Sequence, residues 1–98
     1  MTRSIQLHDA ADVELNEATD YYDLESPGLG EVFLEDIERG LRRIREHPDA
    51  ATAVASGIRK LVLTRFPYAI IYATPADTIR VLAIAHQRKR PYYWRSRG

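Results

Sequence analysis

The sequence contains no cysteine and has no long apolar run. Without cysteine there can be no disulfide, no thiolate nucleophile and no thiolate metal ligand, and the chain suits the reducing cytoplasm, where we expect it to be located. No segment is apolar enough for a signal-peptide core or a membrane span, so we expect neither export nor membrane insertion. We expect a single domain over residues 1–98, a size that folds without metal, and we predict no cofactor.

The formal net charge is zero, but the charges are unevenly distributed along the chain. Residues 1–57 have a net charge of −8 (13 acidic against 5 basic), whereas residues 58–98 have a net charge of +8 (9 basic against 1 acidic). The basic part ends in the run from His86 to Arg97, where arginine and lysine stand beside tyrosine and tryptophan. Zero net charge therefore does not argue against an anionic partner.

The acidic part is predicted to form two amphipathic helices. Apolar residues recur every three or four positions from about Asp9 to Leu24, and again from Leu29 to Ile44. The run 26–30, Ser-Pro-Gly-Leu-Gly, separates the two stripes, because proline fixes φ and glycine disfavours a helix. The short joint predicts an αα-hairpin. Its acidic outer faces suit solvent, basic residues of a partner, or the basic end of the same chain.

The basic part has the period of β-strands. We predict strands at Ile58–Leu63, Phe66–Ala73 and Thr78–His86, joined by short turns in an antiparallel meander. A further short strand is expected near the N-terminus, where apolar and polar residues alternate around residues 5–7. The segment from Ala50 to Gly57 is expected to be a mobile loop.

Strict alternation along the last strand assigns its side chains to two faces. One face is predicted to carry Arg80, Leu82, Ile84 and His86, and the other Ile79, Val81, Ala83 and Ala85. We expect the helical hairpin to cover the second, wholly apolar face and to leave the mixed face partly open.

Five segments carry a family resemblance that extends over nearly the whole chain. They are Ile44-Arg-Glu-His-Pro48, Ile58-Arg-Lys-Leu-Val-Leu63, Arg65-Phe-Pro-Tyr68-x-Ile-x-Tyr72, Ile79-Arg-Val-Leu-Ala-Ile-Ala-His86 and Arg90-Pro-Tyr-Tyr-Trp-x-x-Arg97. In this order they resemble the RelE/ParE superfamily of type II toxin–antitoxin toxins, which includes plasmid stabilisation systems.

The resemblance implies an α+β fold. In this fold an N-terminal strand precedes a helical hairpin packed on an antiparallel β-sheet meander, and a short basic C-terminal tail follows. It also implies a growth inhibitor neutralised by a cognate antitoxin, within a toxin–antitoxin hetero-oligomer that contacts DNA only through the antitoxin. No membrane partner is implied.

The superfamily contains two activities that the fold does not separate. ParE-like members poison DNA gyrase by binding it, whereas RelE-like members are ribosome-dependent mRNA endonucleases. The neutral total charge, the Phe66-Pro67-Tyr68 run and the single lysine in the segment 58–63 favour the ParE-like activity. A RelE-like nuclease and an inactive relative that only binds an antitoxin as a regulatory partner remain alternatives, so whether the chain is an enzyme stays open.

Candidate site residues follow from these alternatives. A nuclease needs a base, an acid and cations near the phosphate, and we assign His86 as base or acid, Arg65 as phosphate clamp and Tyr93 as their partner. Candidates for target or RNA binding are Arg59, Lys60, Arg80, Arg88, Lys89, Arg90, Trp94 and Arg97. Each has a structural alternative, because sheet arginines can be merely solvated and a C-terminal aromatic cluster can close a small sheet. No metal site is predicted.

Overall fold

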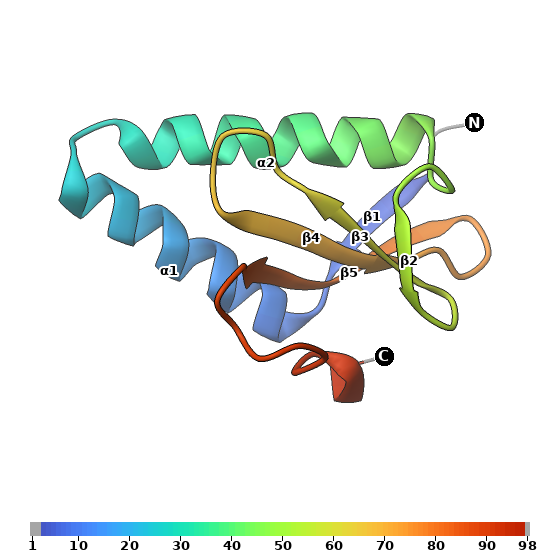
Figure 1. Cartoon of the computed structure of the whole chain (residues 1–98). Helices are drawn as coiled ribbons and strands as arrows, with labels where there is room; N and C mark the ends of the chain where they lie inside the picture. The colour runs from blue at the N-terminus through green and yellow to red at the C-terminus, as the bar shows by residue number, and fades with distance from the viewer. Residues whose placement is uncertain (1–2, 98) are drawn as a thin grey trace.

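A five-stranded sheet separates two helices from the C-terminal segment in the computed structural model, which describes residues 3–97. The elements are β1 (Ser4–Leu7), α1 (Asp9–Glu25), α2 (Leu29–Glu46), β2 (Thr52–Ala55), β3 (Ile58–Val62), β4 (Tyr68–Ala73), β5 (Thr78–His86) and a 3₁₀ turn (Arg95–Arg97). Figure 1 shows α2 and the C-terminal segment on opposite sides of the sheet. The predicted α+β fold is confirmed. Met1, Thr2 and Gly98 of the predicted domain lie outside the described residues.

The helical hairpin closes tightly at the start of α2. Gly28 adopts a φ of +87°, a left-handed conformation that glycine tolerates and other residues rarely adopt. Gly30 is buried, and its N–H donates a hydrogen bond to Asp23 Oδ1 at 2.8 Å. A β-carbon at Gly30 would lie 2.6 Å from the carbonyl oxygen of Thr19. The two helices can therefore meet here only because residue 30 has no side chain.

The strand order is β1-β5-β4-β3-β2. Strands β3, β4 and β5 form the predicted antiparallel meander, while β1 pairs in parallel with the first half of β5, from Ser4 opposite Thr78 to Leu7 opposite Val81. The expected mobile loop from Ala50 to Gly57 is wrong, because β2 occupies half of it and pairs antiparallel with β3. Gly57, with a φ of +72°, provides the tight turn between these two strands.

A β-bulge interrupts the pairing of β4 with β5. Ile71 is opposite Ala83 and Tyr72 is opposite Val81, so Leu82 is an extra residue without a partner. An extra residue in one strand reverses the alternation of the side chains that follow it. The predicted faces of the last strand therefore hold as far as Leu82 and are wrong from Ala83 onwards.

The bulge moves the second half of β5 to new surroundings. Ile84 joins Ile79 and Val81 in the core under the helices, whereas Leu82, Ala83 and Ala85 pack on the opposite face against the C-terminal segment. His86 is two residues beyond Ile84 and stands edge-on to the ring of Tyr68, on the helix side, with ring centroids 4.9 Å apart. The predicted common face of Arg80 and His86 is also wrong.

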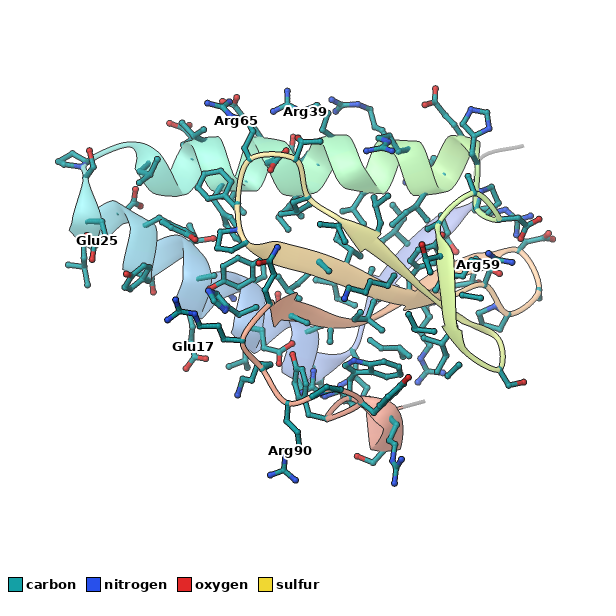
Figure 2. The ribbon with its side chains drawn as sticks, in the orientation of Figure 1. Glu17, Glu25, Arg39, Arg59, Arg65 and Arg90 are labelled. Atoms are coloured by element: carbon teal, nitrogen blue, oxygen red, sulfur yellow. The ribbon has the colours of Figure 1, made fainter. Side chains whose placement is uncertain are left out.

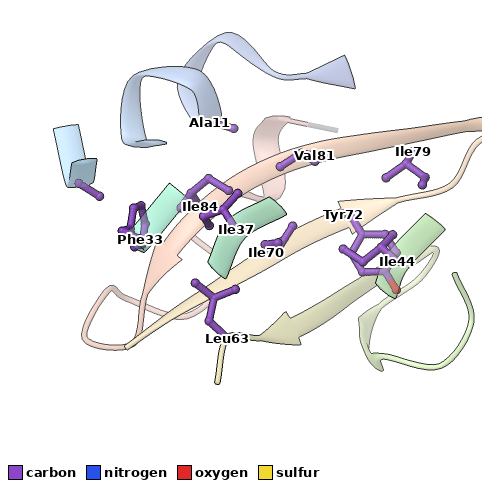
Figure 3. Packing of buried hydrophobic residues seen from close by; sticks show 11 residues of the cluster. Ala11, Phe33, Ile37, Ile44, Leu63, Ile70, Tyr72, Ile79, Val81 and Ile84 are labelled. Atoms are coloured by element: carbon purple, nitrogen blue, oxygen red, sulfur yellow. The ribbon is translucent and has the colours of Figure 1, made fainter. Parts of the chain in front are cut away.

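The main core lies between the helices and the sheet (Figure 3). Its buried members are Ala11 and Ala18 of α1, Phe33, Ile37 and Ile44 of α2, and Leu63, Ile70, Tyr72, Ile79, Val81 and Ile84 of the sheet region. Within residues 3–97, neither helix has the length and apolar composition needed to cross a membrane.

Gly30→Ala tests the close contact of the helices. We expect it to lower the free energy of unfolding by about 1–3 kcal/mol, because the added methyl group forces the helices apart. Urea unfolding followed by circular dichroism measures this change. Glu31→Ala, at the exposed neighbouring position, is the control and should stay within about 0.5 kcal/mol of the parent. Equal stability of the Gly30→Ala variant and the parent would show that the helices separate without cost.

Candidate target-binding groove

A groove with a cavity volume of about 320 Å³ lies between the sheet and the C-terminal segment. Its floor is aliphatic and comes from three neighbouring strands: Val62 of β3, Ala69 and Ile71 of β4, and Ala85 of β5. The segment Pro91–Trp94 forms its wall. A bulky apolar group placed in this groove would therefore meet aliphatic carbon below and aromatic rings beside it.

The rim of the groove is positively charged. Lys60, Lys89 and Arg90 line it together with His86, and no aspartate or glutamate is among the described lining residues. Two large apolar side chains of the groove remain open to solvent, since Val62 is 47% and Tyr92 48% exposed. Such a surface complements a partner that combines negative charge with an apolar group.

The C-terminal segment is folded onto the sheet and is not a free basic arm. Trp94 is only 5% exposed and packs with Leu82 and Ala83. Tyr92 has a φ of +62°, which is unusual for a residue with a side chain and persists only where surrounding contacts fix it. Its ring lies 5.7 Å from the ring of Trp94, centroid to centroid. The wall of the groove therefore has a defined conformation.

One carboxylate of α1 holds this segment. Glu14 Oε2 accepts a hydrogen bond from the hydroxyl group of Tyr93 at 2.8 Å, and Glu14 Oε1 accepts one from Arg97 Nη1 at 2.9 Å. Oε1 also accepts the backbone N–H of Ile84 at 3.0 Å. Arg97 in turn donates to the carbonyl oxygen of Leu82 at 3.1 Å. Glu14 was not among the predicted site residues, and only the general expectation that the acidic helices could face the basic end of the chain pointed towards it.

These contacts keep Tyr93 protonated. Burial raises the pKa of Tyr93, and the hydrogen bond to Glu14 raises it further. The pKa of Arg97 is also raised, chiefly because the guanidinium group donates to Glu14. At neutral pH, Tyr93 is therefore a neutral hydrogen-bond donor.

The three predicted catalytic residues do not all reach the groove. Tyr93 lines it. His86 borders it at the end of β5, but its ring stands against Tyr68 on the helix side of the sheet, and its Nδ1 accepts the backbone N–H of Arg88 at 3.0 Å. Arg65 does not line it, and its backbone N–H donates to the buried carboxylate of Asp36 in α2 at 3.1 Å. Figure 2 shows Arg65 beside α2 and Arg90 on the opposite side of the molecule.

The predicted binding residues divide in the same way. Lys60, Lys89, Arg90 and Trp94 line the groove. The other four lie elsewhere: Arg59 donates to the carbonyl oxygen of Ala51 at 2.7 Å, Arg80 is near residues 6–9, Arg88 is exposed outside the groove, and Arg97 is bound to Glu14. Among residues 3–97, no group of three or more histidine or carboxylate side chains could hold a metal ion.

Comparison with known proteins identifies the family. The family model described as "ParE toxin of type II toxin-antitoxin system, parDE" matches residues 5–91. The chain belongs to the ParE toxin family. The resemblance found in the sequence is confirmed, and family membership makes the chain a type II toxin whose system includes an antitoxin. The model match ends at Pro91, so most of the groove wall and Arg97 lie beyond the matched residues.

Individual relatives agree with this assignment. Toxin ParE2 of Mycobacterium tuberculosis, from strains CDC 1551 / Oshkosh and ATCC 25618 / H37Rv, is 27% identical over 92 residues, which are 93% of this chain and 88% of the relative. A solved structure titled "Chromosomal ParDE TA system from P. aeruginosa" matches with a TM-score of 0.75 at 20% identity. The matched region covers 87% of this chain and 96% of the chain in the solved structure. The match shows that the two chains have the same fold.

The raised pKa of Tyr93 predicts a loss of stability in alkaline solution. The folded state holds the phenolic proton more tightly than the unfolded state, in which the pKa is near 10.0. The stabilisation is therefore complete below about pH 10 and is lost as the pH rises from there towards the folded-state pKa. Between about pH 8 and pH 11, Tyr93→Phe should lose less unfolding free energy than the parent chain, measured by urea titration. Equal losses would contradict this assignment, since the other tyrosines are the same in both proteins.

Proposed function

We propose that this ParE-family toxin inhibits bacterial growth by binding DNA gyrase through the groove and its rim, and that a cognate antitoxin relieves the inhibition in the cytoplasm. The carrying observation is the combination of an aliphatic floor with a positive rim, in a groove with no aspartate or glutamate among its described lining residues. The antitoxin forms a hetero-oligomer with the toxin, and the complex contacts DNA only through the antitoxin.

The composition of the floor favours a protein partner over RNA. A nucleobase has polar edges that need hydrogen bonds, and the side chains of Val62, Ala69, Ile71 and Ala85 offer none. A protein segment with an apolar side chain between acidic residues would instead bury carbon on the floor and place its charges at the rim. We therefore infer that the bound part of the target is an acidic segment with an apolar anchor.

The state of the candidate catalytic groups also favours binding without chemistry. Tyr93 donates to Glu14 and has a raised pKa, which makes it a poor base. Arg65 is attached to α2 through Asp36 and does not line the groove. A nuclease that uses Tyr93 and Arg65 would need both residues to move before RNA could react.

A RelE-like mRNA endonuclease is the second candidate, and one observation favours it. His86 and Tyr93 line the same groove as Lys60, Lys89 and Arg90, and such cations suit phosphate groups. In this alternative His86 acts as base or acid, and the cations at the rim stabilise the phosphate charge.

Induction of the chain in bacteria separates the candidates. We expect growth to stop while mRNA 5′ ends mapped within minutes stay unchanged, and purified gyrase to accumulate cleaved DNA in the presence of the chain. Codon-phased cuts in translated mRNA would establish the nuclease instead. Harmless expression of the soluble, folded chain would favour an inactive relative that only binds an antitoxin.

Charge variants of the rim test the location of the contact surface. The double variant Lys60→Gln/Arg90→Gln should weaken gyrase binding several-fold, because rim charges steer association, and the effect should shrink as salt is added. The matched control is Arg42→Gln/Arg45→Gln, which removes the same charge from exposed positions of α2. Surface plasmon resonance with immobilised gyrase measures both. Equal binding by the two double variants would place the contact outside the groove.

His86→Gln distinguishes a catalytic from a peripheral role of this residue. If the chain acts by binding, we expect growth inhibition to change less than about threefold, because the variant alters one residue at the edge of the surface. A nuclease that uses His86 as its acid or base should lose about 100-fold or more of its activity. The growth rate at matched soluble expression gives the result.

A further inference from the structure

We propose that Glu14 is the positioning residue of the groove, meaning that it holds the C-terminal wall in place without contacting the target. The effect of Glu14 on toxicity rests on the proposed function, whereas its effect on the wall does not. Glu14 does not line the groove, so any influence on a bound partner must pass through the residues that it holds.

The position of Glu14 is set by an incomplete strand pairing. Strand β1 pairs with β5 only as far as Val81, and beyond this point no strand formed by residues 3–97 continues along that edge of β5. Two backbone groups at this edge are bound by side chains instead, since Ile84 N–H donates to Glu14 and the Leu82 carbonyl accepts from Arg97. Backbone groups left without such partners are costly to bury. At this edge the Glu14–Arg97 pair therefore supplies the hydrogen-bond partners that the backbone of a neighbouring strand would otherwise supply.

The pair is partly shielded from water. The side chains of Glu14 and Arg97 are each 17% exposed, and their atoms approach to 2.9 Å. A charge pair at this depth interacts more strongly than an exposed surface pair, and removing one partner leaves the other without its counter-charge. Loss of the Glu14 charge should therefore free Arg97 from the edge of β5.

Release of Arg97 affects the whole wall because of the order of residues along the chain. Tyr93 and Arg97 both bind Glu14, and Trp94 lies between them in a buried site against Leu82 and Ala83. Tyr92, with its left-handed backbone, directly precedes the first of these contacts. Weakening of the contacts to Glu14 therefore loosens Tyr92, which is exposed in the groove, and Trp94, which is buried beside it.

The only tryptophan of the chain makes this testable. Glu14→Gln retains the size of the side chain and an acceptor oxygen but removes the charge. We expect the fluorescence of Trp94 to shift to longer wavelength and to become at least twofold more sensitive to quenching by acrylamide, while the helical circular dichroism signal stays. Affinity for purified DNA gyrase should fall tenfold or more. Glu17→Gln, which removes the same charge at an exposed position further along α1, is the control and should change neither reading.

Variants of Arg97 test the same contact from the other side and replace Glu14→Gln if that variant does not fold. Arg97→Gln should reproduce the change in Trp94 fluorescence, Arg97→Lys should restore part of the parent signal, and Arg95→Gln in the same 3₁₀ turn should have no effect.

A Trp94 signal that stays at the parent value in both Glu14→Gln and Arg97→Gln overturns the proposal. Loss of gyrase binding with an unchanged Trp94 signal also overturns it, because Glu14 would then act on the target directly. An exposed Trp94 with unchanged growth inhibition supports the positioning role and contradicts the groove as the target surface.

Discussion

The two faces of this sheet depend on one extra residue in β5, the strand between β1 and β4. Because Leu82 has no partner on β4, the second half of β5 is turned relative to the first. The small side chains of Ala83 and Ala85 therefore lie under the C-terminal segment, where they leave room for the ring of Trp94. Without the extra residue these alanines would face the helices, and Ile84 would face Trp94. The second core cluster, and with it the groove, follows from this single irregularity in the pairing.

The helices and the meander were predictable because each has a strong local signal. The hairpin has two apolar stripes of helical period with a proline–glycine break between them, and the predicted third strand has the same bounds as β5. Two features had no such signal. Strand β2 is an edge strand of small residues, mostly exposed, so it lacks the alternation that reveals a half-buried strand. The bulge lies within a continuous apolar run, in which a shift of one residue changes no residue type and leaves no trace in the sequence.

The candidate site was predictable only as far as charge alone reveals it. Lys60, Lys89 and Arg90 were identified from the basic composition of the second half of the chain, and they do line the groove. The aliphatic floor was not, because alanine and isoleucine on a strand look like ordinary core residues. Glu14 could not be singled out among the many acidic residues of the helices, since its role depends on an arginine 83 positions away. Sequence reasoning thus found the basic and aromatic side chains around the groove and missed its aliphatic floor and the carboxylate that holds its wall.

The parallel pairing of β1 with β5 also constrains when the sheet can be completed during synthesis. Residues 4–7 leave the ribosome early, but their partners at 78–81 emerge only after both helices and strands β2 to β4. The helical hairpin, whose contacts are local, can form while the chain is still growing, whereas the sheet cannot gain its first strand until β5 is made. The contact between Glu14 and Arg97 must form later still, because Arg97 is synthesised after β5. A growing chain can therefore have its helical hairpin before it has the groove, whose wall and carboxylate contact both need the residues that follow β5.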